Sequence, residues 1–80
     1  MAEDTQGVKQ RDIRSVFGER VRELRAERDW SQEKMAEATG LHWTYIGQTE
    51  RGERNLTLRS IQKIAKGLKI EMAELFKGMG

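Results

Sequence analysis

The sequence predicts an all-α domain of five short helices, and three observations lead to that fold class. From Ile13 onward, apolar residues recur at the spacing of buried helix faces, and no stretch shows the strict alternation of a half-buried strand. The chain contains no proline, which would break a helix interior. Serine, threonine and glycine, which are typical of helix ends, stand between the apolar stretches.

The first predicted helix runs from Ile13 to about Arg28. Its charged residues fall outside one apolar stripe, which consists of Val16, Phe17, Val21 and Leu24. Residues 1–12 are polar and charged. We therefore expect a flexible tail over residues 1–12 and a folded domain over residues 13–77.

The second predicted helix begins after Ser31, a residue type that caps helix N-termini well. Met35 and Ala36 would face the interior. The helix would end at Gly40, because glycine readily adopts the left-handed conformation that stops a helix.

A third helix is expected directly afterwards, from about His42 to Arg51, with Tyr45, Ile46 and Thr49 facing inward. Two short helices joined by a tight turn at Gly40 have the spacing of a helix-turn-helix. In that motif the second helix enters the major groove of DNA. The segment from Ser31 to Gly52 therefore indicates nucleic-acid recognition.

Two further helices complete the predicted fold. Thr57 would cap the fourth helix, whose buried face would carry Leu58, Ile61, Ile64, Ala65 and Leu68. Glu71 and Glu74 have the spacing of a capping box for a short fifth helix. Outside the fourth helix, the default core residues are Phe17, Val21, Trp30 and Tyr45.

Composition excludes several classes of function. Eighty residues make one domain, which has little core to spare for an active-site cleft. There is no cysteine, no pattern of metal ligands, no nucleophile with a recognisable base beside it and no phosphate-cradling glycine loop. His42 is the lone histidine. We therefore expect no enzyme, no metal and no cofactor.

The sequence also predicts a soluble, cytoplasmic protein that does not contact a membrane. No apolar run approaches the ~18 residues of a membrane span, and the N-terminus has no apolar signal core.

Positive charge is concentrated in one part of the chain. Residues 40–69 hold six Lys and Arg against two Glu, although the net charge of the whole chain is only +2. This excess begins at the expected recognition helix, where phosphate contacts would be needed. Uneven charge also arises by chance on a surface this rich in charged residues, so this observation only supports the motif.

Several short motifs occur together at characteristic distances from Phe17 to Phe76. They are Phe17-Gly18, Leu24-Arg25, Ser31-Gln32, Ala36, Gly40, Ile46, Glu50-Arg51-Gly52, Leu56-Thr57-Leu58, Ile61, Lys63-Ile64-Ala65 and Glu74-Leu75-Phe76. In this combination the chain resembles the lambda-repressor-like helix-turn-helix family, the Cro- and cI-type regulators. The stretch from Thr44 to Leu56 is most similar to the controller proteins of restriction–modification systems.

The resemblance implies that the exposed face of the third helix reads base edges with Trp43, Thr44, Gly47 and Gln48. Glutamine can bond adenine through two hydrogen bonds, and a threonine methyl can contact a thymine methyl. Gly47 either lets the helix approach the groove closely or is simply a weak helix former. The second alternative costs ~1 kcal/mol relative to alanine.

Trp43 departs from the family pattern, in which a polar or basic residue often stands at this position. An indole cannot donate two hydrogen bonds to guanine. It could pack on thymine methyls or sugars, or the domain or a partner could cover it.

The resemblance also implies phosphate contacts, which position the domain without reading sequence. Arg54 is the leading candidate. The full set is Gln32, His42, Arg51, Arg54 and Asn55. For Gln32 and Arg51 the alternative is an ordinary solvated side chain, and for His42 it is a cap on the third helix.

Two structural roles follow from the same resemblance. Arg25 and Glu50 would form an internal ion pair that ties the first helix to the third. The apolar residues near the C-terminus exceed what one small core needs, so we expect a twofold interface built from Leu68, Ile70, Met72, Leu75 and Phe76.

The predicted function is a homodimeric, sequence-specific regulator of transcription that binds a pseudo-palindromic site on double-stranded DNA. A restriction–modification controller, a phage-type repressor and an antitoxin all fit the pattern. RNA polymerase is a further conceivable partner. The alternative from another class is a protein-interaction module on the same fold, with Trp43 as its anchor.

Overall fold

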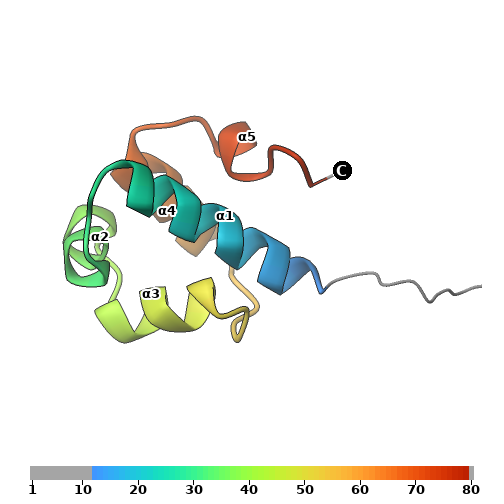
Figure 1. Ribbon diagram of the computed structural model, residues 1–80, viewed down its shortest axis with the longest axis horizontal. Coiled ribbons are helices and arrows are strands. Elements are labelled where there is room, and N and C mark those ends of the chain that lie inside the picture. The colour runs from blue at the N-terminus through green and yellow to red at the C-terminus, as the bar shows by residue number, and fades with distance from the viewer. Residues whose placement is uncertain (1–11, 80) are drawn as a thin grey trace, which may run out of the picture.

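The computed structural model describes residues 12–79, which form five α-helices and no strand. The all-α prediction is therefore confirmed. The helices are α1 Ile13–Glu27, α2 Gln32–Thr39, α3 Trp43–Glu50, α4 Leu58–Leu68 and α5 Met72–Leu75. Figure 1 shows α3 and α5 on opposite sides of α1. Of the tail expected over residues 1–12, residues 1–11 lie outside the described residues.

Asp12 begins the folded domain. Its carboxylate accepts a hydrogen bond from the backbone N–H of Arg14 at 2.9 Å, which makes Asp12 the N-cap of α1. The Arg14 guanidinium also pairs with this carboxylate at 2.7 Å. The first helix thus begins at Ile13, as the sequence predicts, and Asp12 is the residue that caps it.

The crossing of α1 over α3 depends on Gly18. A Cβ at this position would lie 2.7 Å from the backbone oxygen of Glu50 and closer still to that of Thr49. Any larger residue would push the two helices apart. Gly18 therefore sets how closely α3 is held to the body of the domain.

The turn between α2 and α3 forms as the sequence predicts. Ser31 Oγ accepts from Lys34 N–H at 3.0 Å at the start of α2, and Gly40 ends the helix with a left-handed φ of 77°. The Thr39 hydroxyl donates to Met35 O at 2.9 Å and accepts from Leu41 N–H at 3.3 Å. These bonds fix the direction in which α3 leaves the turn.

The core draws on every helix. Its buried apolar side chains are Phe17, Val21, Leu24, Met35, Ile46, Ile64, Ala65, Leu68 and Leu75. Thr49 is buried as expected, while Val16, Ala36, Ile61 and Trp30 are partly buried. One core therefore holds both helices of the helix-turn-helix against α1, α4 and α5.

Two expectations about α4 and α5 were wrong. Leu58, expected in the buried face of α4, is 78% exposed. It lies in the first turn, whereas α2 approaches α4 near its far end, where Gly67 meets Ala38 and Thr39. The capping box is also missing, because Glu71 is the N-cap of α5 but makes no side-chain cap hydrogen bond.

We expect an NMR titration to give Asp12 a pKa of about 2, below its ordinary 3.8, because Arg14 donates to the carboxylate from its side chain and backbone. In Arg14→Ala the pKa should rise toward 3.8. Since the pKa is lowered on folding, the linked stabilisation is complete above pH 3.8 and is lost as the pH falls toward 2. Arg22→Ala is the control, and an unchanged pKa in Arg14→Ala would contradict the assignment.

Candidate nucleic-acid interface

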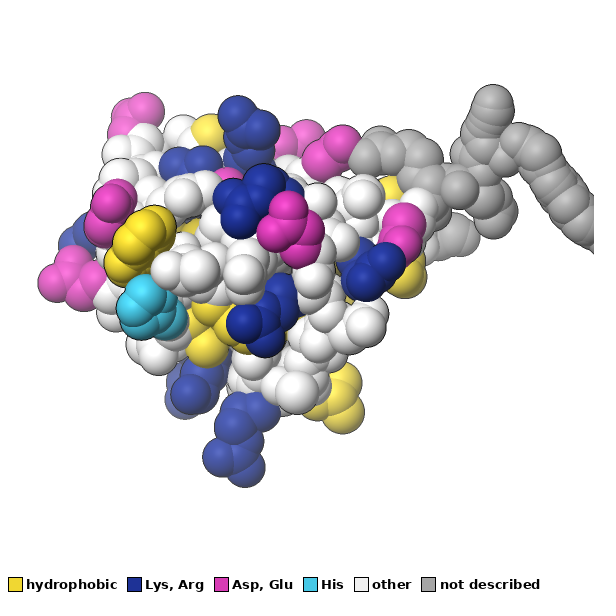
Figure 2. Space-filling view, turned by 90° about the horizontal axis from the view of Figure 1, so that it is seen from below, with side chains coloured by type: hydrophobic (Ala, Val, Ile, Leu, Met, Phe, Trp, Pro, Cys, Tyr) yellow, Lys and Arg dark blue, Asp and Glu magenta, His cyan; other side chains and the backbone are white. Residues whose placement is uncertain are grey.

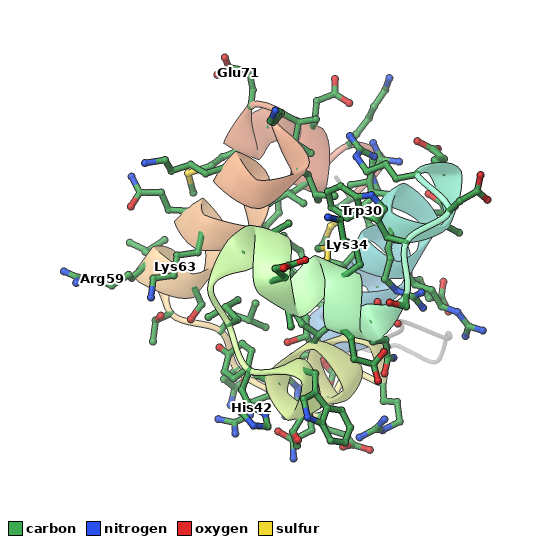
Figure 3. All side chains as sticks on the ribbon, turned by 90° about the vertical axis from the view of Figure 1, so that its left-hand side faces the viewer. Trp30, Lys34, His42, Arg59, Lys63 and Glu71 are labelled. Carbon is green, nitrogen blue, oxygen red and sulfur yellow. The ribbon has the colours of Figure 1, made fainter. Side chains whose placement is uncertain are left out.

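The first turn of α3 carries three exposed side chains, His42, Trp43 and Thr44. His42 is the N-cap, and its Nδ1 accepts from Thr44 N–H at 3.0 Å. Its ring stacks on Trp43 with centroids 5.8 Å apart and planes inclined by 27°. Figure 2 shows this face with the histidine in cyan, and in Figure 3 His42 lies at the lower edge of the molecule.

Trp43 is 53% exposed. The domain therefore does not cover it, which removes one of the alternatives left open by the sequence. An aromatic pair at the beginning of a recognition helix offers apolar surface to whatever approaches α3. Two alternatives remain for Trp43, which are contact with nucleic acid and contact with a protein partner.

The loop after α3 turns back onto that helix. Glu53 N–H donates to Gln48 O at 2.9 Å. Arg54 Nε then donates to Gln48 Oε1 at 2.8 Å, and the Arg54 guanidinium carbon lies 4.6 Å from the centre of the Tyr45 ring. The structure thus brings together an expected base-contacting residue and an expected phosphate-contacting residue.

The remaining candidates on the loop are less closely held. Arg51 is exposed and pairs with Glu53 at 3.1 Å, and Asn55 is exposed. Both side chains can reach a ligand without disturbing the core.

The expected ion pair between Arg25 and Glu50 forms. Arg25 donates to both carboxylate oxygens of Glu50, at 2.6 and 3.0 Å, and also to Trp30 O at 2.7 Å. The Glu50 side chain is only 4% exposed and that of Arg25 is 16% exposed. Hydrogen bonding to Glu50 raises the pKa of the Arg25 guanidinium, so the arginine stays charged.

Gln32 extends this network. Its Nε2 donates to Glu50 Oε1 at 3.1 Å, which links the first residue of α2 to the last residue of α3. One amide hydrogen of Gln32 is therefore engaged within the protein, and a phosphate would have to use the other hydrogen or the backbone.

Comparison with known proteins shows the family. A helix-turn-helix family model matches residues 21–75, from the middle of α1 to the end of α5. The chain belongs to this helix-turn-helix family.

Three relatives of this helix-turn-helix protein are informative. Control protein C.SmaI of Serratia marcescens is 44% identical over 86% of this chain and 82% of its own length. The restriction–modification controller C.AhdI of Aeromonas hydrophila shares 47% identity and a TM-score of 0.78, over 80% and 97% of the two chains. Controller C.Esp1396I, solved as a tetramer with its 35-base-pair operator, shares 32% identity and a TM-score of 0.77, over 85% and 90%.

Gly47 does not lie on the exposed face of the recognition helix, contrary to our expectation. It is buried. A Cβ there would meet Arg51 Nη1 at 3.2 Å and Gln32 Oε1 at 3.4 Å, so these side chains cover this part of α3. The pattern of apolar residues within α3 predicts which face of the helix is buried by the core, but it cannot predict contacts from side chains of other segments, such as Gln32.

Tyr45 was expected in the core, but it is only half-buried. Its ring supports Arg54 instead, a role that the sequence analysis missed. The sequence shows only that Arg54 lies nine positions after Tyr45. The contact itself depends on the path of the loop after α3, which is a tertiary feature.

The expected dimer surface also needs correction. Leu68 and Leu75 are 2% and 0% exposed, so they belong to the core and have no surface to offer a partner. A helix of only one turn is not stable by itself, so α5 depends on the packing of Leu75 in the core. Ile70 and Met72 are partly buried against the core. Phe76 is 40% exposed, and its ring lies 5.3 Å from that of Phe17.

The described part of the chain lacks the features of two other kinds of protein. Within residues 12–79 no three His, Asp or Glu side chains are grouped so that they could share a metal ion. No helix in that range has the length and apolar character needed to cross a membrane.

We expect Glu50→Ala to lower the free energy of unfolding by about 3 kcal/mol, because it leaves the partly buried charge of Arg25 without its partner. Urea denaturation followed by circular dichroism measures this loss. Lys34→Ala is the control, since it removes an exposed pair with Glu37 and should cost less than about 1 kcal/mol. Equal losses in the two variants would contradict a structural role for the buried pair.

Proposed function

We propose that this chain is a homodimeric, sequence-specific DNA-binding regulator of transcription that acts as the control protein of a restriction–modification system in the cytoplasm. The observation that carries the proposal is the helix-turn-helix itself. It presents α3 with an exposed first turn and a loop carrying two arginines immediately after it. The similarity to control proteins over most of their length supports the narrower assignment.

In this proposal α3 enters the major groove and its exposed side chains face the bases. Trp43, Thr44 and Gln48 are the base-contacting residues. Gly47 contributes through its missing side chain, which lets Gln32 and Arg51 lie over the helix. Trp43 supplies apolar contact to thymine methyls or sugars rather than a hydrogen-bonded guanine contact.

Phosphate contacts would come from both sides of the recognition helix. Gln32 lies at the N-terminus of α2, where a helix attracts an anion. The other proposed contacts are His42, Arg51, Arg54 and Asn55. Arg51 and Arg54 bring positive charge to the α3 side of the molecule, which is the face shown in Figure 2. These contacts would hold α3 in register without reading sequence.

A homodimer would place two recognition helices one helical turn of DNA apart, ~34 Å, on a pseudo-palindromic site. Phe76 supports a twofold contact on the α5 side. It lines a groove with Ile13 and Leu56 that extends to Arg54 and Asn55, and α5 lies across the molecule from α3. A contact confined to the Phe76 end of this groove would leave both recognition helices and both Arg54 side chains accessible. Ile70 and Met72 would contribute their exposed parts.

Binding to DNA should be both sequence-specific and dependent on salt. The wild type should enrich a pseudo-palindrome from a library of randomised duplexes, and its affinity should fall as salt rises. Gln48→Ala should weaken specific binding by about 1–3 kcal/mol and leave non-specific binding nearly unchanged. Fluorescence anisotropy with the selected site and a scrambled duplex measures both affinities.

Absence of any salt-dependent binding to duplex DNA would refute this function. It would favour a protein-interaction module, for which the exposed Trp43 would be the anchor. A retained DNA affinity with no sequence preference would refute specificity alone.

Dimerisation should depend on Phe76. We expect sedimentation analysis over a range of concentrations to give a dimer for the wild type and a monomer for Phe76→Glu, because the substitution introduces charge into an apolar surface. Trp43→Glu is the matched control, as Trp43 is an exposed aromatic residue on the recognition helix. Loss of the dimer in both variants, or in neither, would contradict this surface.

The genetic neighbourhood tests the narrower assignment. Adjacent genes for a methyltransferase and an endonuclease would support a controller, whereas a toxin gene would support an antitoxin and prophage genes a phage-type repressor. If the protein activates transcription, we expect it to contact RNA polymerase. In vitro transcription from the selected site measures the sign of regulation.

A further inference from the structure

We propose that Arg54 is a positioning residue that fixes the side-chain amide of Gln48, so that Gln48 presents its NH₂ group to the DNA and selects guanine, which has two acceptors in the major groove. This inference rests on the proposed function and names the class of base that one position of the recognition helix prefers. It gives Arg54 a role in sequence selection besides the expected contact with phosphate.

The geometry determines which end of the amide faces Arg54. Arginine has hydrogen-bond donors only, so the Gln48 atom 2.8 Å from its Nε must be the carbonyl oxygen. The guanidinium is held in turn by the Tyr45 ring, 4.6 Å from its carbon. The backbone bond from Glu53 N–H to Gln48 O fixes the start of the same loop on α3.

The arrangement leaves the opposite end of the amide available. Within residues 12–79, Gln48 Nε2 donates no hydrogen bond, and neither terminal nitrogen of Arg54 donates one. Gln48 can therefore donate to a base while Arg54 donates to a phosphate. One phosphate contact would then immobilise Arg54, Arg54 would hold the Gln48 oxygen, and the NH₂ group would be directed at the groove.

A glutamine held in this way differs from a free one. A free amide bonds adenine with both ends, because it accepts from the adenine amino group and donates to N7. With its oxygen turned toward Arg54, Gln48 offers donors alone. Guanine presents two acceptors, N7 and O6, to such donors in the major groove, adenine and thymine present one each, and cytosine presents none. The constraint therefore predicts guanine opposite Gln48 and disfavours cytosine most.

Lysine cannot replace Arg54 in this role. An ammonium group retains the positive charge and can still contact phosphate, but it lacks the planar fork that donates through Nε while lying on an aromatic ring. Arg54→Lys therefore separates positioning of Gln48 from simple charge attraction. Gln48→Glu tests the orientation itself, because one carboxylate oxygen can keep the bond to Arg54 while the other replaces the NH₂ group with an acceptor.

The experiment is selection from a library of randomised DNA duplexes, followed by affinity measurements on selected sites in which one base pair is varied. The wild type should show one position per half-site that prefers guanine by roughly tenfold or more over cytosine, with adenine and thymine between the two. Arg54→Lys should reduce that preference to about twofold or less while the rest of the site is retained. Gln48→Glu should reverse it, so that cytosine or adenine is favoured.

Arg59→Ala is the matched control. Arg59 is exposed and projects from α4 in Figure 3, so its loss removes one positive charge without touching Gln48. It should lower affinity equally at all sites and leave the base preference unchanged. Circular dichroism verifies that every variant is folded, and in a Gln48→Ala background Arg54→Lys should have no further effect on the preference.

Two failures can be told apart. If the wild type enriches a site but Arg54→Lys keeps the full preference, or Gln48→Glu keeps the wild-type base, the positioning role is wrong and the proposed function stands. If the wild type enriches no site at all, the proposed function fails and this inference falls with it.

Discussion

The ion pair between Arg25 and Glu50 is the constraint on which the reading surface depends. It joins the C-terminal part of α1 to the last residue of α3 through two short hydrogen bonds, and Gln32 brings the start of α2 to the same carboxylate. Burial makes the pair sensitive to loss of either member. The orientation of both helices of the motif is therefore fixed at the C-terminal end of α3, away from its exposed first turn.

The residues proposed to meet DNA differ in how firmly the fold holds them. Gln32 and Gln48 are each bonded to a charged side chain, and His42 is engaged as a helix cap. Among the described residues, the interaction that restrains the Trp43 ring is its stacking on His42. A preorganised amide loses less freedom on binding than a free one, which favours discrimination between bases. Trp43, by contrast, offers adaptable apolar contact.

The sequence predicted the helices well because their ends are determined locally. Ser31, Gly40 and Thr57 mark helix boundaries through hydrogen bonds or backbone conformations that involve only near neighbours. Prediction was weaker where exposure depends on another segment. Leu58 has the spacing of a core residue but is 78% exposed, while Leu75 is buried although its spacing equally suited an interface.

The sequence by itself therefore determined the five helices, the turn at Gly40, the pairing of Arg25 with Glu50 and membership of a helix-turn-helix family. The helices and the turn are encoded in local hydrogen bonding and backbone conformation, whereas the pairing of Arg25 with Glu50 was implied by the family resemblance. Only the tertiary structure decided that Gly47 is covered, that Tyr45 supports Arg54 and that Arg54 faces the oxygen of Gln48. Those facts depend on the path of the loop after α3, and a loop's path is set by packing against the completed fold rather than by its own residues.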